Sequence, residues 1–332
     1  MHVGLAGAGR IGAFHAGVLR SIPLVDSLTV TDPDHDRAAQ VAQAAGGVCV
    51  ESPEALLDGG VDAVVIAAAT PAHARLLHLA ADAGVPAFCE KPIALDLATT
   101  DAVIEHVRCA GILVHIGFQR RFDAGYRAAR EAVLSGTLGD VYLVRLATHD
   151  PAPPPERYVA GSGGIFADLS VHDVEVAPWV LGRPIVEVYA DGTATDPVFR
   201  RHGDVDVAAA VLRFDGGTMG ILSAGRHDPR GYDIRMELFG SNDSLVVGMD
   251  GRTPLRSVEP GVPAPAERGY RDFVDRFEPA YRAELTAFLD AVRDGSPSPC
   301  TVDEARRALV VALAAQRSRA EHRPVPVDEV AG

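Results

Sequence analysis

The sequence predicts an α/β protein in two parts: a doubly wound parallel sheet, then an α+β region with an open, mostly antiparallel sheet. Two observations carry this prediction. Buried apolar strands alternate with helices through residue 118, a pattern typical of a parallel sheet covered on both faces. After residue 117, closely spaced strands with short turns take over, as in antiparallel hairpins. The length of 332 residues also favours two domains, which we place at 1–120 and 121–332.

The first part contains alternating elements that the turn residues delimit. The predicted strands are 3–5, 27–31, 47–50, 61–67, 86–89 and 112–116. The predicted helices are 11–19, 36–45, 52–57, 71–83 and 96–110. Right-handed crossovers between such strands give a doubly wound sheet.

The second part is dominated by strands. They are expected at 141–148, 185–190, 205–214, 218–224, 232–239 and 244–249. A helix at 122–135 precedes them, and helices at 281–293 and 302–321 close the chain. Residues 251–268, rich in Pro and Arg, are expected to form a loop.

A glycine pattern follows the first strand directly. Gly7, Gly9 and Gly12 match G-x-G-x-x-G and open the predicted helix 11–19. In a dinucleotide-binding turn, the first glycine permits the tight turn, the second lets the backbone approach a pyrophosphate, and the third lets helix and strand pack closely. The start of the helix then offers N–H groups to the phosphates. The pattern therefore predicts a Rossmann-type cofactor site.

The end of the second strand supports this prediction. Asp32 follows strand 27–31 and lies twenty residues after Gly12. A carboxylate there can accept both hydroxyls of an adenosine ribose and repels a 2′-phosphate. Since no Arg or Lys precedes Arg37, the sequence favours NAD over NADP. The alternative is that Asp32 only begins the Asp-Pro-Asp turn.

Composition excludes several function classes. Lys and Arg number 31 against 45 Asp and Glu, a net charge of −14, which argues against nonspecific nucleic-acid binding or attraction to an anionic membrane. The four cysteines form no C-x-x-C pair and show no zinc spacing, so we expect no metal site and free thiols in a reducing compartment, the cytoplasm. No apolar run approaches a bilayer span, and the start resembles a strand rather than a signal peptide.

Two segments carry candidate chemistry. Lys91 follows a predicted parallel strand, where its ammonium could polarise an oxygen or relay a proton; the alternative is a surface turn. The Lys91–Pro92 peptide could be cis. Asp168 and His172 lie four residues apart in a predicted helix that continues to Leu181, so they would share one face. His172 suits proton removal from a hydroxyl, although both side chains could also be structural.

A pair of arginines marks the junction of the two parts. Arg120 and Arg121 could bind a ligand or carboxylates between the domains. Structural ion pairs are the stronger interpretation for at least one of them. The remaining histidines, His15 among them, show no usable pattern and are expected to be structural or solvated.

Together these motifs resemble the Gfo/Idh/MocA oxidoreductase family, and the resemblance covers essentially the whole chain. It rests on Gly7 to Gly12, Thr70-Pro71 with His73, Glu90-Lys91-Pro92, Gly117 to Asp123, and Gly163-Gly164 with Asp168, His172 and Asp173. It implies an NAD-dependent enzyme that moves a hydride between nicotinamide and a secondary alcohol.

The resemblance also implies roles for particular residues. Lys91, Asp168 and His172 would be the catalytic group. The residues that would bind NAD are Gly7, Gly9, Arg10, Ile11, Gly12, Asp32, Thr70, His73, Glu90, Lys91 and Gln119. Thr70, His73, Glu90 and Gln119 would line the nicotinamide side.

Within the family, the Pro-rich stretch 150–155 and Gly231-Tyr232-Asp233 look most like inositol 2-dehydrogenases. A cyclic polyol, inositol above all, is therefore the expected substrate. Lys91, Asp168 and His172 would contact it, with His149 and Tyr232 as further candidates. The chain departs from the inositol pattern at residues 169 and 170, where a bulkier residue and a threonine are expected.

The sequence leaves other functions open. The chain could be a dehydrogenase or oxidoreductase of aldoses or sugar acids. It could also be a non-catalytic NAD(H) sensor, although such a sensor could lose Lys91 and His172, and both are present. A third alternative is glycosidase chemistry with NAD in a redox cycle. An open sheet leaves one face to cover, and the resemblance implies a homo-oligomer, a tetramer or a dimer.

Overall fold

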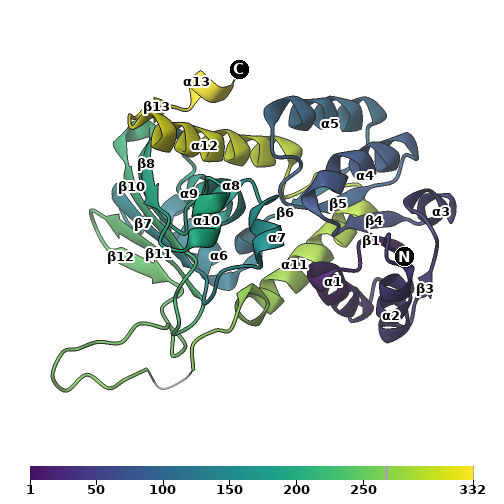
Figure 1. The fold of residues 1–332 in the computed structure, drawn as a ribbon, viewed down its shortest axis with the longest axis horizontal. Coiled ribbons are helices and arrows are strands. Elements are labelled where there is room, and N and C mark those ends of the chain that lie inside the picture. Colours follow the sequence, from purple (N-terminus) through teal and green to yellow (C-terminus); the bar gives the residue numbers. More distant parts are fainter. Residues whose placement is uncertain (266–267, 332) are drawn as a thin grey trace. The chain divides into compact units, whose positions relative to one another are not determined.

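The computed structural model describes residues 1–265 and 268–331 and divides the chain into two compact units (Figure 1). Unit 1 combines Met1–Gln119 with Pro279–Arg307, and unit 2 combines Arg120–Glu278 with the chain from Ala308 onward. Both units contain one β-sheet and the helices that cover it. Our sequence division also separates the chain at 120, but it places all of 121–332 in the second domain.

Unit 1 is built on a six-stranded sheet of order β3-β2-β1-β4-β5-β6, in which every pair is parallel. The strands are β1 (His2–Ala6), β2 (Ser27–Thr31), β3 (Val48–Cys49), β4 (Ala63–Ile66), β5 (Ala87–Glu90) and β6 (Val114–Gly117). This order is that of the doubly wound dinucleotide fold. The fold class predicted for the first part is confirmed.

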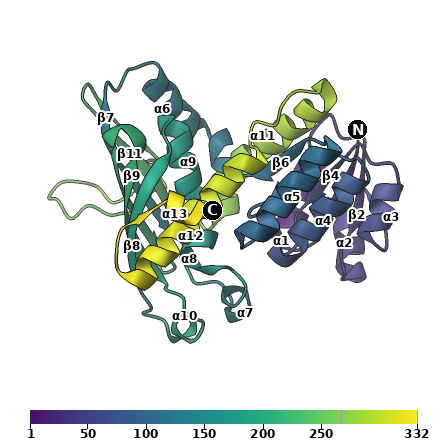
Figure 2. The ribbon, with the colours of Figure 1, turned by 90° about the horizontal axis from the view of Figure 1, so that it is seen from above.

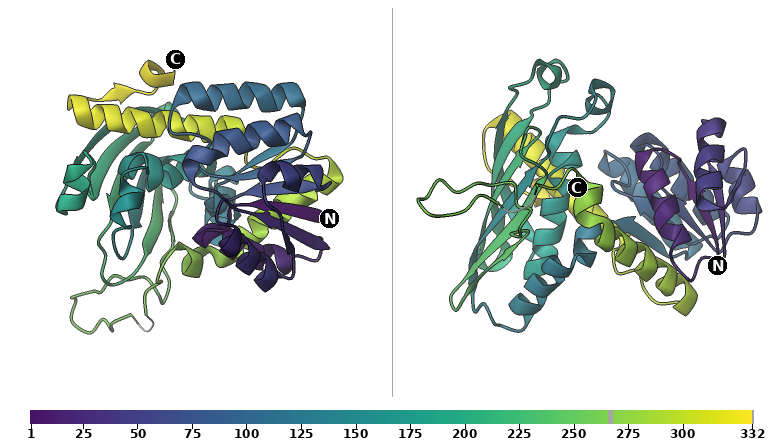
Figure 3. Two further views of the ribbon diagram at one scale, coloured as in Figure 1. Left: turned by 45° about the vertical axis from the view of Figure 1, so that its right-hand side comes forward. Right: turned by 90° about the horizontal axis from the view of Figure 1, so that it is seen from below.

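Alternate residues of these buried strands face two different helix layers. Val3, Leu5 and Val65 belong to a core that also contains residues of α1 (Arg10–Arg20), α2 (His35–Ala45) and α11 (Phe273–Asp294). On the other face lie α3 (Pro53–Asp58), α4 (Thr70–Asp82) and α5 (Leu97–Ala110), and α4 and α5 run side by side (Figure 3, left). Burial on both faces explains why these strands are mostly apolar and do not alternate between polar and apolar residues.

The segment 279–307 belongs to unit 1 for a packing reason. Leu285, Phe288 and Leu289 of α11 are fully buried in the core of the parallel sheet. The N–H of Ile116 in β6 also donates to the carbonyl of Cys300 at 3.0 Å. The sequence predicted α11 only from residue 281, whereas the helix begins at Phe273 and contains Pro279.

Unit 2 is built on a seven-stranded mixed sheet of order β12-β11-β7-β10-β9-β8-β13, in which only β7 and β10 pair in parallel. The strands are β7 (Val141–His149), β8 (Ile185–Thr193), β9 (Val207–Phe214), β10 (Met219–Gly225), β11 (Asp233–Gly240), β12 (Ser244–Val247) and β13 (Val325–Pro326). Residues of β9 alternate strictly between exposed and buried. The prediction of an open, mostly antiparallel sheet is confirmed.

Helices cover one face of this sheet. They are α6 (Ala124–Leu134), α9 (Val171–Leu181) and α12 (Val302–Glu321), all on the same side of the strands (Figure 2). Shorter elements also occur: η1 (Gln119–Phe122), α7 (Glu156–Val159), α8 (Gly164–Asp168), α10 (Pro197–Arg201), η2 (Asp215–Gly217) and α13 (Asp328–Ala331). The sequence did not predict α7, α10, α13 or β13, since segments this short carry no periodicity.

Two other expectations concern the second part of the chain. The predicted continuous helix up to Leu181 is wrong, because Leu169 and Ser170 separate α8 from α9. The predicted loop 251–268 has neither helix nor strand in its described residues, and 266–267 lie outside them. Over the described parts of the chain, no helix has the length and apolarity that a membrane span requires.

Candidate functional site

The glycine turn connects β1 to α1, and its three glycines have different surroundings. Gly7 has a φ of +110°, and a Cβ there would overlap the backbone of Ala67. A Cβ on Gly12 would overlap the carbonyl oxygen of Gly7. A Cβ on Gly9 would meet nothing within 4 Å. The fold therefore requires Gly7 and Gly12, whereas the open space at Gly9 fits the close approach of a pyrophosphate.

We expect Gly9→Ala and Gly12→Ala to fail in different ways. Gly12→Ala should lower the free energy of unfolding by about 1–3 kcal/mol or more, because its methyl group meets backbone. Gly9→Ala should cost less than about 1 kcal/mol of stability. Its NAD affinity should nevertheless fall at least about tenfold, or about 1.4 kcal/mol. Urea unfolding and cofactor titration measure the two effects. Normal NAD affinity in Gly9→Ala would remove Gly9 from the phosphate site.

Asp32 is fixed beside this turn. Its carboxylate accepts hydrogen bonds from the N–H of Ala8 (2.7 Å), the N–H of Asp34 (2.8 Å) and the guanidinium of Arg37 (2.5 Å). Burial raises the pKa of Asp32, but these hydrogen bonds outweigh it, so the pKa lies below its usual value. The carboxylate thus has the charge that ribose binding requires. The sequence did not predict that Arg37, whose side chain is half-exposed, reaches it.

Asp32→Ala should weaken NAD binding and relax the preference over NADP. Without the carboxylate, the ribose hydroxyls lose their acceptor and a 2′-phosphate meets no like charge, so the preference should fall at least about tenfold. Arg37→Ala is the matched control, because it removes a partner of Asp32 and keeps the carboxylate. Kd values for both cofactors, measured by titration, check the result. An unchanged preference in Asp32→Ala would remove this residue from the ribose site.

Lys91 follows the last residue of β5, at the carboxyl end of the parallel sheet, and is half-buried. Its peptide bond to Pro92 is cis, as the sequence allowed. The loop is held by His73 of α4, which is 1% exposed. The ring of His73 contacts the carbonyls of Pro92 (Nδ1, 2.7 Å) and Ala68 (Nε2, 3.0 Å). His73 therefore connects the loop after β5 to the loop between β4 and α4, at the carboxyl end of the parallel sheet.

Glu90, beside Lys91, has a buried partner that sequence reasoning missed. The Nε2 of His15 lies 2.7 Å from Oε1 of Glu90, and His15 has no exposed surface. The ring of His15 also packs edge-on against Phe88 and Tyr281. His15 lies three residues after Gly12 on α1, so it connects the glycine turn to the strand that precedes Lys91.

The other predicted cofactor residues of unit 1 occupy element starts. Arg10 and Ile11 are the first residues of α1, exposed and half-buried respectively. Thr70 is the first residue of α4 and is half-buried. Gln119 begins η1 and is 2% exposed.

The predicted catalytic residues of unit 2 flank the break between α8 and α9. Asp168 ends α8, and both of its oxygens accept hydrogen bonds: Oδ1 from the Tyr158 hydroxyl (2.7 Å) and Oδ2 from Arg226 (2.6 Å). His172 is the second residue of α9 and is half-buried. The argument that both share one helical face does not apply, because the helix is interrupted between them.

Sequence reasoning also missed Tyr158 and Arg226. Tyr158 lies 10 residues before Asp168 but outside the motif, whereas Arg226 lies 58 residues after it and carries no signal beyond its place directly after a strand. The two candidate substrate residues lie at one end of β7 and β11. His149 ends β7 and contacts the Ser223 hydroxyl (3.1 Å), while Tyr232 precedes β11 and is 5% exposed. Asp233, next to Tyr232, lies opposite His149 in the register of the antiparallel strands β11 and β7.

The arginine pair at the start of unit 2 is structural. Arg120 binds Asp173 at 2.5 Å, and Nε of Arg121 binds Glu175 at 2.5 Å. All four side chains are buried. This confirms the ion-pair interpretation and leaves neither guanidinium exposed for a ligand.

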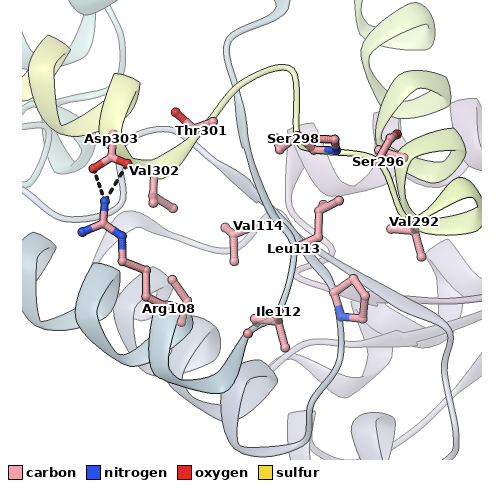
Figure 4. Close-up of a pocket in the computed structure, with 16 residues that line it drawn as sticks. Arg108, Ile112, Leu113, Val114, Val292, Ser296, Ser298, Thr301, Val302 and Asp303 are labelled. Carbon is pink, nitrogen blue, oxygen red and sulfur yellow. Dashed lines mark hydrogen bonds and ion pairs between the residues drawn. The ribbon is translucent and has the colours of Figure 1, made fainter.

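A surface hollow of about 590 Å³ lies at the amino ends of β5 and β6, whereas Lys91 follows the carboxyl end of β5 (Figure 4). Pro86 and Leu113, which line it, precede β5 and β6, and Arg108 and Asp303 pair at 2.6 Å on one side. Since Lys91 follows the other end of β5, this hollow is separate from the predicted cofactor site. Residues 1–265 and 268–331 contain no group of three or more His, Cys, Asp or Glu suited to a metal ion.

A doubly wound sheet with an open glycine turn and a fixed acidic residue after β2 defines a dinucleotide-binding oxidoreductase fold. The chain belongs to the Gfo/Idh/MocA family. Its residues 1–118 match the model of the oxidoreductase family with an NAD-binding Rossmann fold, and residues 126–246 match a C-terminal domain of that family. NAD is therefore the cofactor of this fold, and the open space at Gly9 and the carboxylate of Asp32 fit it.

Inositol dehydrogenases of other organisms match the chain over nearly its whole length. A myo-inositol dehydrogenase of Streptomyces leeuwenhoekii is 40% identical and covers 96% of this chain and 97% of its own. A myo-inositol 2-dehydrogenase of Thermotoga maritima is 36% identical, with complete coverage of both chains. The crystal structure of scyllo-inositol dehydrogenase from Lactobacillus casei, with NAD(H) and scyllo-inositol bound, has a TM-score of 0.88 at 26% identity and 99% coverage of each chain.

Proposed function

We propose that this chain catalyses the NAD-dependent oxidation of a secondary hydroxyl of a cyclic polyol, and that the polyol is an inositol. The full-length similarity to myo-inositol dehydrogenases is the observation that carries this proposal. The alternative within the family is an aldose or sugar-acid dehydrogenase, since fold alone does not determine the substrate.

A substrate screen tests the proposal. Inositols, aldoses and sugar acids are each incubated with NAD⁺, and the absorbance of the reduced cofactor is followed. Myo- or scyllo-inositol should give the highest kcat/KM. A higher value with an aldose or sugar acid would favour the alternative, and NAD binding without turnover on any substrate would favour a sensor.

Within this function, we propose that Lys91, Asp168 and His172 act on the substrate. When bound, NAD⁺ supplies the hydride acceptor. His172 takes the proton of the substrate hydroxyl as a general base. The ammonium of Lys91 stabilises the negative charge that develops on the same oxygen. Asp168 orients the substrate or its partners, and its two fixed oxygens support such a role.

We also infer that copies of this chain associate through the outer face of the unit 2 sheet, as a dimer or tetramer. Tyr189, Val211 and Ile221 lie in register across β8, β9 and β10, and each is about 40% exposed. Neighbouring exposed apolar residues on these strands are Val186, Val207 and Met219. An apolar patch of this kind marks an interface between proteins.

Val211→Lys, at the centre of this row, should shift the chain to a smaller assembly, because it buries an unpaired charge in the apolar interface between Tyr189 and Ile221. Val258→Lys, at an 86% exposed loop residue, is the matched control. Light scattering after size-exclusion chromatography gives the mass. A wild-type monomer, or an unchanged mass in Val211→Lys, would contradict the inference.

For the cellular location we propose the cytoplasm. The free state of Cys49, Cys89, Cys109 and Cys300 is consistent with a reducing compartment.

A further inference from the structure

Arg226 is a buried arginine outside every motif of the sequence. It follows β10 directly and is 4% exposed. Its backbone N–H donates to the carbonyl of Asp206 at 2.9 Å, which anchors its Cα. A buried guanidinium is costly unless carboxylates or other acceptors surround it, so its partners indicate what it is for.

Those partners are two carboxylates from different elements. Nη1 donates to Oδ2 of Asp150, directly after β7, at 2.7 Å. Nη2 donates to Oδ2 of Asp168, at the end of α8, at 2.6 Å. One planar guanidinium therefore fixes the position of Asp168 relative to the sheet, with the directionality that a lysine ammonium lacks.

The second oxygen of Asp168 is held from another side. The hydroxyl of Tyr158, on α7, donates to Oδ1 at 2.7 Å. Burial and the nearby Asp168 raise the pKa of Tyr158, so the phenol stays protonated and donates. Burial lowers the pKa of Arg226, but its two carboxylates outweigh that effect and raise it. The group thus joins one guanidinium to two carboxyl groups and a phenol that donates its proton.

We propose that Arg226 is a positioning residue that fixes the orientation and ionised state of Asp168, and through that carboxylate sets the protonation of His172. The proposal rests on the proposed function, in which Asp168 and His172 act on the substrate. His172 follows Asp168 by four residues, across the break between α8 and α9. The titratable groups that contact Asp168 or its guanidinium partner in the described structure are Tyr158, Arg226 and Asp150.

The test compares two variants with opposite electrostatic effects. Arg226→Met keeps the length of the side chain and leaves Asp150 and Asp168 without their shared cation. The pH at which Asp168 and His172 release their protons should therefore rise, and the acid limb of the kcat/KM profile should move up by about one pH unit or more. Asp150→Asn removes a negative charge and keeps the bond from Arg226 to Asp168, so the acid limb should move to lower pH.

The rate and the binding constants separate positioning from general damage. Arg226→Met should lower kcat for inositol oxidation by about 10- to 100-fold, the scale of a misplaced catalytic group. NADH affinity, measured by fluorescence titration, should stay within about twofold, because the described partners of Arg226 all belong to unit 2. Arg226→Lys keeps the charge and should keep the acid limb near wild type while kcat falls less. Tyr158→Phe removes a hydrogen bond without a charge and should leave the limb in place.

Each outcome has a distinct meaning. Acid limbs that move in the same direction in Arg226→Met and Asp150→Asn would overturn the proposal, as would a wild-type profile and rate in Arg226→Met. If Arg226→Met does not fold, the direction of the shift in Asp150→Asn and the position of the limb in Arg226→Lys decide. Asp168→Asn is assayed in parallel. Wild-type turnover in Asp168→Asn would reject the catalytic role of Asp168 itself, whereas lost turnover there with a normal Arg226→Met rejects only the positioning role.

Discussion

Lys91→Ala and His172→Ala should each lower kcat for inositol oxidation by at least ~100-fold, the usual scale for a group that transfers or stabilises a proton. In the mechanism that we propose, Lys91→Ala removes the ammonium that stabilises the developing charge on the substrate oxygen. His172→Ala removes the proposed acceptor of the hydroxyl proton. Steady-state kinetics with saturating NAD⁺ measure the effect, and NAD affinity should stay near wild type in both variants.

The double variant makes this prediction sharper, because Lys91 and His172 belong to different compact units. If both groups act on one substrate oxygen in one step, the loss in the double variant should be smaller than the product of the two single losses. Arg20→Ala, at an exposed position at the end of α1 that is remote from the glycine turn, serves as a control for surface substitutions in unit 1. Retained turnover in both single variants would refute the assignment.

Arg120→Met should cause the largest loss of stability, about 3–5 kcal/mol, because it leaves a buried charge without its partner. Arg120 is 1% exposed and Asp173 has no exposed surface. The hydroxyl of Thr148 completes the group, accepting from Arg120 at 3.0 Å and donating to Asp173 at 2.7 Å. Removal of the guanidinium strands the carboxylate in the interior of unit 2.

An exposed ion pair on the unit 2 sheet provides the comparison with the buried Arg120 pair. Arg145 pairs with Glu237 at 2.9 Å, and its side chain is 52% exposed. Arg145→Met should therefore lower the free energy of unfolding by no more than about 1 kcal/mol. Urea unfolding followed by circular dichroism measures both variants. If both variants lowered the free energy of unfolding equally, burial would not determine how much the Arg120 pair contributes to stability.

The sequence predicted those parts of the site that depend on local backbone requirements. The turn at Gly7 needs a positive φ, and the contact at Gly12 admits no Cβ, so glycine at both positions marks the turn in the sequence itself. The position of Asp32 follows from the regular length of one strand–helix–strand unit. The alternation of apolar strands with helices, and later the close spacing of strands with short turns, predicted the two sheet types.

The prediction was weaker where a local pattern had two structural solutions. The segment up to Leu181 has helical composition throughout, yet Leu169 and Ser170 interrupt it. The helix α11 begins eight residues earlier than its apolar pattern, since Phe273 lies eight positions before the predicted start at residue 281. Packing of Phe277 and Phe288 in separate units decided its length, and no window of sequence contains that information.

From the sequence alone came the fold of both parts, the cofactor turn, and the lysine and histidine that we assign to catalysis. Only the tertiary structure decided which side chains hold Glu90 and Asp168, the carboxylates beside them in the motifs. His15 and Glu90 are 75 residues apart, and Asp168 and Arg226 are 58 apart. Such pairs form because distant strands and helices become neighbours, and a buried charge takes whichever opposite charge the fold brings within hydrogen-bond distance.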